Sequence, residues 1–382
     1  MARYFFNFPT PVTPIAKETL YIHDLFLVII TVIFILSVTI LFYSVFTHRK
    51  SRGHQPASFT APSGKKQWMF ALIPFLTLAF IDYVILGIPA YHSVLAMADT
   101  KEGAGMVVKI TASQWKWQYE YPSYGIKYTS SLSTPEDEIY GDAPPDKHFL
   151  REVNHPLVLP TDEKVRILLT STDVIHSWWV PAFGVKQDTV PGFLRETWVK
   201  IDKPGVYRGQ CAELCGVGHA FMPIVVVAKT KPEFKQWLAE QKTTQAAVAA
   251  ESTKTFTKEE LIAKGKKVFD TNCAVCHQSN GLGIPGTFPP IAAGHPFSAS
   301  AQMIADLTKL GFYKDGKIVM GPVKNHIEIV RHGIPGTAMP AFEAQLSDVD
   351  IAAVITYERN DFGNHTGDVI QPAQAKGVGA GK

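Results

Sequence analysis

Two short segments in the second half of the chain hold the residue types that bind transition metals. The first is Gly209–Pro223, which contains Cys211, Cys215, His219 and Met222. Thiolate, thioether and imidazole ligands together favour copper over zinc or magnesium. A mononuclear blue-copper centre needs a single cysteine, two histidines and a weakly bound methionine, so this segment has one cysteine more than such a centre requires.

The second histidine of this set is His176, which lies upstream in Asp173–Trp178. Two thiolates can bridge two copper ions and leave one histidine for each ion, so the predicted centre is dinuclear. The alternatives are a Cys211–Cys215 disulfide, credible outside the cytoplasm, and a zinc site. The disulfide would leave the nearby histidine and methionine unexplained, and zinc does not call for methionine.

The second segment is Cys273-Ala-Val-Cys276-His277, the spacing at which two thiols attach a haem and the next imidazole binds its iron. A thioredoxin-like redox pair would need a βαβ context, and a zinc site would need a second pair of ligands, and the sequence has neither. The predicted sixth ligand is Met339, which precedes Pro340 in a loop. Met320 and Met303 are weaker candidates.

The elements that position these segments begin with two apolar runs. Residues 25–46 carry no charge, and a second run covers about 68–91, each long enough to cross a bilayer as a helix. The loop between them holds five basic residues and no acidic one from His48 to Gln67, which predicts that this loop is cytoplasmic and that everything after residue 98 lies on the outer face. The alternative, a cleaved signal peptide, fits poorly because the first run is too long and a basic cluster follows it.

The remaining 284 residues, 99–382, read as two further domains. Alternating aromatic residues over 106–121 and β-rich runs at 165–169, 196–201 and 224–228 predict a β-sandwich or barrel over 99–240. Next come a short helix to about Gln241 and a linker over 241–256. They are followed by an all-α domain over 257–362 and by a Gly- and Ala-rich tail over 363–382, which is predicted to be disordered.

The composition excludes several classes of protein. The 382 residues suggest two or three domains, and only 19% of them are charged, which argues against a largely disordered chain. A net charge of +3 without a long basic stripe argues against nucleic-acid binding. Four cysteines are too few for a disulfide scaffold.

Together these motifs resemble subunit II of haem–copper cytochrome c oxidases with a fused class I cytochrome c. The resemblance covers nearly the whole chain and includes the helix hairpin, Gln114–Trp117, Asp173–Pro181 and the copper loop. It implies a two-helix transmembrane hairpin, a cupredoxin-like β-sandwich with the dinuclear copper centre called CuA, and an all-α cytochrome c. It implies that the chain carries electrons from cytochrome c through CuA to the subunit I that reduces oxygen.

The resemblance also assigns residues. Cys211 and Cys215 would bridge the coppers, and the remaining ligands would be His176, His219, Met222 and the backbone carbonyl of Glu213. The Glu213 side chain would bind magnesium at the border with subunit I. Trp115 matches the tryptophan that receives electrons from cytochrome c, and its alternative role is a residue of the sandwich core.

One position departs from the family pattern. Family members commonly have a glutamate three residues before the tryptophan that opens the second helix, at the mouth of a proton path into subunit I. This chain has Lys65 there, followed by Lys66, which puts the proton-pumping stoichiometry in doubt. Asp82 lies inside the second apolar run, and we expect it to face a polar partner in another subunit.

The expected setting is a bacterial inner membrane crossed twice, with both termini and both metal domains on the outer face. The expected partners are subunit I, subunit III, membrane lipid, and a donor that is cytochrome c or an upstream quinol-oxidising complex. A nitrous-oxide-reductase-like enzyme would need a His-rich copper-cluster domain, which thirteen scattered histidines do not supply. A copper carrier would need an open, exchangeable site, and a quinol-oxidising relative is expected to lack both Cys211 and Cys215.

Overall fold

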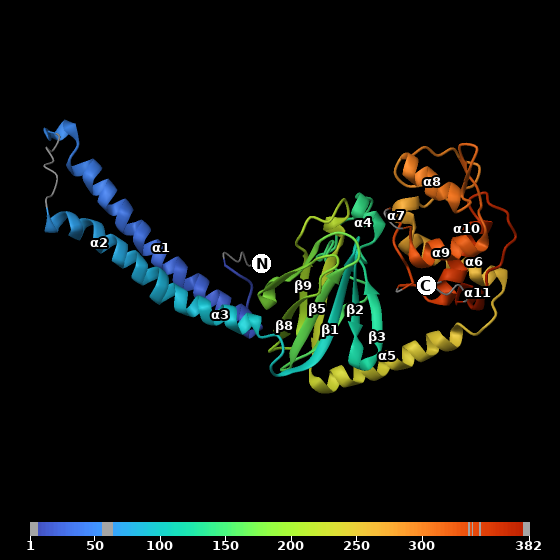
Figure 1. Ribbon diagram of the computed structural model, residues 1–382, viewed down its shortest axis with the longest axis horizontal. Coiled ribbons are helices and arrows are strands. Elements are labelled where there is room, and N and C mark those ends of the chain that lie inside the picture. The colour runs from blue at the N-terminus through green and yellow to red at the C-terminus, as the bar shows by residue number, and fades with distance from the viewer. Residues whose placement is uncertain (1–6, 56–63, 335–336, 338, 344, 377–382) are drawn as a thin grey trace. The chain divides into compact units, whose positions relative to one another are not determined.

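The computed structural model (Figure 1) describes residues 7–55, 64–334, 337, 339–343 and 345–376. The chain divides into two compact units. The first contains residues Met1–Ser123 and Ser130–Phe234, and the second contains Tyr124–Thr129 and Lys235–Lys382.

The N-terminal part of the first unit is a hairpin of two long apolar helices. Helix α1 spans Pro14–Thr47, begins at the N-cap Thr13 and has Pro14 in its first turn, where proline is favoured. The return limb contains α2 (Lys65–Phe80), a π-helical turn (Ile81–Gly87) and α3 (Ile88–Ala98). Both limbs are long and apolar enough to cross a membrane. They are longer than the predicted runs because the helices continue past the uncharged residues into polar sequence.

The end of this hairpin that contains Thr13 and Ala96 is bonded to the β-sandwich. Thr13 Oγ1 donates a hydrogen bond to the Phe183 carbonyl at 2.6 Å, and Lys17 forms an ion pair with Asp202. On the other limb, the Ala96 carbonyl accepts a hydrogen bond from Trp198 Nε1 at 2.9 Å. These contacts hold one end of the sandwich against the start of α1 and the end of α3.

The sandwich contains two five-stranded sheets. The first has the order β3-β2-β1-β5-β8 and the second β4-β10-β9-β6-β7, with parallel pairing of β1 to β5 and of β4 to β10. The strands are β1 (Ala104–Ser113), β2 (Lys116–Tyr121), β3 (Ile126–Ser130), β4 (Leu157–Pro160), β5 (Lys164–Ser171), β6 (His176–Val180), β7 (Val185–Thr189), β8 (Arg195–Lys200), β9 (Gly205–Cys211) and β10 (Pro223–Lys229). Alternate residues of β1, β2 and β5 are buried, as the period-two pattern predicts. The short helix α4 (Glu136–Tyr140) lies in the long connection between β3 and β4.

Helix α5 spans Lys231–Glu251 and therefore runs through most of the predicted linker. The helix was expected to end near Gln241, but Ala, Gln and Glu residues that follow favour helix even without a core to pack against. The side chains from Thr243 to Ala250 are exposed. The linker is thus a helical spacer for much of its length.

The C-terminal domain is helical, as predicted. Its helices are α6 (Lys258–Asn272), α7 (Ala274–His277), α8 (Ala301–Lys309), α9 (Val323–His332), α10 (Asp348–Asn360) and α11 (Pro372–Lys376), with a small hairpin of β11 (Tyr313–Lys314) and β12 (Lys317–Ile318). The predicted capping box of Thr257 and Glu260 at the start of α6 is confirmed. Helices α6, α9 and α10 enclose the main core, and a smaller core lies beside α8.

The prediction of a disordered tail from residue 363 is wrong as far as Lys376; residues 377–382 lie outside the described part of the chain. Ile370 and Ala375 are buried in the main core, and the Ile370 amide donates to Thr356 Oγ1 on α10 at 3.0 Å. Asp368 pairs with Arg359 at 2.7 Å. The Gly- and Ala-rich composition concealed these few anchoring residues, because small residues can also allow close packing.

The close crossing of α6 and α10 depends on Gly265. A Cβ atom there would lie 2.1 Å from the Ala353 carbonyl oxygen and 2.7 Å from Tyr357 Cβ. We therefore expect Gly265→Ala to destabilise the C-terminal domain by roughly 1–3 kcal/mol, although alanine is the better helix former. Thermal unfolding measures this, with the exposed Lys267→Ala as control; an unchanged melting temperature for Gly265→Ala would contradict the close crossing.

Candidate metal centres

The two cysteines of the copper loop come together at the end of β9. Cys211 is the last residue of β9, and its amide donates to the Met222 carbonyl at 3.0 Å, which closes the loop before β10 begins. The sulfur atoms of Cys211 and Cys215 are 3.7 Å apart and unbonded. Nδ1 of His219 lies 3.5 Å from the Cys215 sulfur. Two thiols and one imidazole therefore face one another within a single loop.

His176 joins them from the neighbouring strand. It is the first residue of β6, is fully buried, and places Nδ1 4.0 Å from the Cys211 sulfur. Its other ring nitrogen, Nε2, lies 3.0 Å from Asp173 Oδ1. A carboxylate on the far nitrogen of a metal-binding histidine fixes the ring's orientation and tautomer. Asp173 is a residue whose role the sequence reasoning missed, and its spacing three residues before His176 is the available signal.

Met222 and Glu213 complete the loop. Met222 is 1% exposed, and the Glu213 carbonyl oxygen lies 3.3 Å from the Cys211 sulfur. The structure thus places soft thiol sulfurs, imidazole nitrogens and a backbone carbonyl at the same end of the sandwich, beside a buried methionine. This donor set fits copper, which thioether and thiolate ligands select.

The two thiols do not ionise alike. Burial opposes ionisation of Cys211, but hydrogen bonds, above all with His176, lower its pKa to about 6. Burial and the neighbouring charge of Cys211 raise the pKa of Cys215 to about 12. Two thiolates this close repel each other, so a cation between them is the natural way to hold both in the charged form.

Trp115 lies against the copper loop, in the turn between β1 and β2. Its Nε1 donates to the Cys215 carbonyl at 3.1 Å, and Gln114 Nε2 donates to the same oxygen at 2.9 Å. A Cβ atom on Gly218 would lie 2.3 Å from the Trp115 ring. Trp117, Tyr119 and Tyr121 are the buried residues of the aromatic stripe, so Trp115 is not part of the core.

The second site is at the end of α6. Cys273 ends that helix, and Cys276 and His277 lie in the single turn of α7. His277 Nδ1 is 2.8 Å from the Pro289 carbonyl oxygen, and burial lowers the pKa of this histidine. The hydrogen bond assigns the proton to Nδ1 and leaves Nε2 as a neutral iron ligand, an arrangement that fits haem attachment.

The candidate sixth ligands have different surroundings. Met339 and Cys273 both pack against the main core, and the Met339 carbonyl accepts a hydrogen bond from the Ile334 amide at 3.1 Å. The sulfur of Met320 lies 3.9 Å from an Arg359 nitrogen, and Met303 packs against the smaller core. Met339 thus packs against the same core as Cys273, and its role as the sixth ligand stays a prediction.

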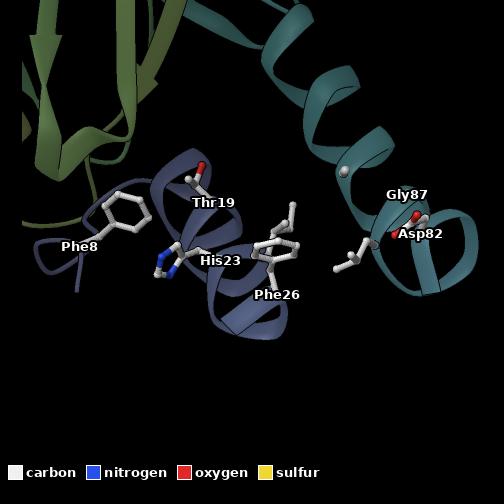
Figure 2. A pocket seen from close by; sticks show the side chains of 9 residues that line it. Phe8, Thr19, His23, Phe26, Asp82 and Gly87 are labelled. Atoms are coloured by element: carbon white, nitrogen blue, oxygen red, sulfur yellow. The ribbon is translucent and has the colours of Figure 1, made fainter. Parts of the chain in front are cut away.

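Asp82 lines an open hollow of about 550 Å³ between the two limbs of the hairpin (Figure 2). Thr19, His23 and Phe26 of α1 line the same hollow, together with Gly87 of the π-helical turn. Asp82 is the only Asp, Glu, Lys or Arg between Gln67 and Ala98 on the second limb, and the structure adds His23 from the first limb to this hollow. About three helical turns further along the second limb, Ser93 donates to Glu18 at 2.8 Å, so this end of the hairpin is polar.

Three families of known proteins match successive parts of the chain. Residues 2–88 match the transmembrane domain of cytochrome c oxidase subunit II, residues 106–229 match its periplasmic domain, and residues 262–360 match cytochrome c. The periplasmic domain of subunit II of cytochrome oxidase from Bradyrhizobium japonicum is 39% identical; the match covers 37% of this chain and 96% of that one, with a TM-score of 0.33.

A probable cytochrome c oxidase subunit 2 of Rickettsia bellii is 34% identical over 234 residues, which are 61% of this chain and 82% of that protein. The chain belongs to the cytochrome c oxidase subunit II family. The subunit 2 of Cereibacter sphaeroides is 32% identical over 61% of this chain and 78% of its own length. As a subunit II with a C-terminal cytochrome c domain, the chain is a membrane component of an oxidoreductase complex, and its two domains imply copper of the CuA type and haem.

Proposed function

We propose that this chain is the electron-entry subunit of a terminal oxidase, which passes electrons from its cytochrome c domain through CuA to subunit I. The observation that carries the proposal is that one chain holds both the thiol–imidazole loop of the sandwich and the Cys-x-x-Cys-His turn. When bound, the two cofactors carry single electrons. The chain supplies their ligands and keeps the two thiol sulfurs and the two imidazoles in a fixed arrangement.

We assign Cys211 and Cys215 as the bridging ligands and His176 and His219 as the terminal ones. Met222 and the Glu213 carbonyl complete the proposed set. Asp173 acts as a positioning residue, because its hydrogen bond holds the His176 ring. The Glu213 side chain is half-buried, and we propose that it binds magnesium at the border with subunit I.

The surface of the copper loop supports docking to another oxidase subunit. Leu214 and Val217 expose 79% and 87% of their surfaces at this loop, and Phe221 exposes 37%. Exposed apolar residues that gather at a functional loop are typical of protein interfaces. We propose that subunit I covers this surface and that subunit III is a further partner. Membrane lipid surrounds the remaining hairpin surface.

The proposed orientation follows from the connection between α1 and α2. Arg49, Lys50 and Arg52 follow α1, and Lys65 and Lys66 open α2. Basic residues in a short loop keep it in the cytoplasm, so both metal domains lie on the periplasmic face of the bacterial inner membrane.

Trp115 is the proposed point at which electrons enter the copper loop. We expect Trp115→Phe to keep the aromatic ring, lose the hydrogen bond to the Cys215 carbonyl, and slow reduction of copper by at least about tenfold, which corresponds to about 1.4 kcal/mol of barrier. Rapid mixing with a reduced donor measures the rate. The control is copper content, which should stay at two ions per chain; an unchanged rate would contradict the assignment.

The order of reduction tests the proposed function. The full chain with haem and copper bound is mixed rapidly with reduced soluble cytochrome c, and the absorption bands of haem and copper are followed. We expect the haem to gain the electron first and then to lose it as copper is reduced. Reduction of copper at the same rate in a chain that lacks the covalent haem would contradict a role for the fused domain.

A further inference from the structure

The C-terminal domain contains a buried pair of ionisable residues that neither metal site uses. His326 lies on α9 and Glu358 on α10, and Nε2 of the histidine is 2.8 Å from Oε2 of the glutamate. The two residues are only 6% and 3% exposed. Burial of such groups is costly, so their presence in a core suggests a function beyond packing.

The histidine ring has one hydrogen-bonded nitrogen and one that is not. Nδ1 of His326 is buried and has no hydrogen-bond partner within the described part of the chain. The edge of the ring meets Phe312 at a centroid distance of 5.4 Å. A neutral ring therefore leaves Nδ1 as an unpaired acceptor, and a protonated ring leaves it as an unpaired donor. The pair therefore combines one short contact between two groups that can carry a proton with one buried ring nitrogen that has no hydrogen-bond partner in the described part of the chain.

Hydrogen bonds connect the backbone of Glu358 to the segment that positions His277. The Glu358 carbonyl accepts from Asn364 Nδ2 at 2.7 Å, and the same amide nitrogen lies 3.1 Å from the Ile291 carbonyl. Two residues earlier, the Pro289 carbonyl accepts the hydrogen bond of His277. Burial lowers the pKa of His277, and the charges of Glu358 and His326 act on it in opposite directions, so both lie within electrostatic reach of the ligand.

The other charged groups around the pair are already neutralised. Arg359, the next residue of α10, is buried and bonds to the Gly321 carbonyl at 2.9 Å and to Asp368 at 2.7 Å. On α9, His332 lies beside Glu328 and Glu343 at the far end of the helix. The charge of Arg359 is therefore already balanced by Asp368, and His332 lies six residues further along α9 than His326.

We propose that the His326–Glu358 pair is a redox-linked proton site, which gains one proton from solvent when the haem iron is reduced. This proposal rests on covalent haem at Cys273 and Cys276. An external one-electron donor supplies the electron that converts ferric to ferrous iron, and water supplies the proton that adds to the pair. No covalent bond forms between heavy atoms. When the iron is oxidised, the electron passes to a one-electron acceptor and the pair releases its proton to solvent.

The sign of the pH dependence follows from Coulomb's law. The additional positive charge of ferric iron disfavours the proton, so the pair binds it more weakly in the oxidised state than in the reduced state. Between the two resulting pKa values, reduction takes up a proton and the midpoint potential falls as pH rises. Below and above this range the potential is constant. We expect the two proton affinities to differ by at least about tenfold, or one pKa unit.

The test is a potentiometric titration of the full chain with covalent haem between pH 5 and 9, read from the haem absorption. We compare the unaltered chain with His326→Gln and Glu358→Gln, and use His332→Gln on the same helix as the matched control. The expected result is a falling potential in the unaltered chain and the control, and a flat one in both variants. A dye in weakly buffered solution should also report up to one proton taken up per haem reduced.

A potential that does not change with pH in the unaltered chain, or an unchanged slope in both variants, would overturn the proposal. If one of the two variants fails to bind haem, the titration of the other variant still tests the proposal. If electrons do not pass from haem to copper, the proposed function is wrong, but the haem potential should still fall with pH as described above. A flat titration would overturn the role of the pair and leave electron transfer intact.

Discussion

Cys215→Ser is expected to lower the copper content from two ions per chain to one or none and to slow electron delivery to subunit I by at least about 100-fold. Loss of a residue that only supports a ligand typically costs 10–100-fold in metal affinity, and Cys215 is a proposed bridging ligand. The sulfur atoms at 3.7 Å are close enough to share the same ions, and serine offers a harder oxygen with a much higher pKa. Copper analysis and oxygen uptake by the assembled oxidase measure the two effects.

The matched control is Cys276→Ser, which removes a thiol from the other domain and should leave two coppers per chain. Two coppers in Cys215→Ser, with normal oxygen uptake, would show that this thiol is not a bridge. A variant at Asp173 extends the series: Asp173→Asn should weaken copper binding by about 10–100-fold while it leaves all proposed ligands in place.

The combined change Cys273→Ala/Cys276→Ala is expected to abolish covalent haem and to destabilise the C-terminal domain. Without the two thiols no haem would be attached beside His277, and the core against which Cys273 and Met339 pack would lose the contacts that the haem is expected to make. Electron delivery from the donor should fall by at least about tenfold, since a tethered donor domain provides an effective concentration in the millimolar range. Haem staining after denaturing electrophoresis and oxygen uptake are the measurements.

Copper content is the internal control for this variant, because the sandwich is part of a separate compact unit with its own core. We expect two coppers per chain to remain. Full oxygen uptake without haem, at the same donor concentration, would mean that electrons reach copper directly from the soluble donor.

The parts of the molecule that sequence could predict are those whose signal is local. The copper ligands Cys211, Cys215, His219 and Met222 lie within twelve positions, and the loop that closes β9 onto β10 keeps them together. The capping box at Thr257 likewise marks the start of α6 within four residues. In such features, residues that are close in the sequence are also close in space, so their spacing in the sequence is enough to predict the contact.

Other features depend on tertiary contacts that cannot be predicted from the spacing of residues in the sequence. Trp115 continues the alternation of the aromatic stripe, yet the chain turns between β1 and β2, so it lies on the copper loop instead of in the core. The tail depends on Ile370 packing against α10. His326 and Glu358 are 32 positions apart, and only the packing of α9 on α10 makes them a pair.

The central claim is that one chain carries both a dinuclear copper centre and a haem c. The most direct test is to purify the full chain from the membrane, quantify copper and haem per chain, and record the electron paramagnetic resonance spectrum. The account predicts two coppers, one haem, and one unpaired electron shared by the two coppers. One haem without copper, with Cys211 and Cys215 joined in a disulfide, would contradict it.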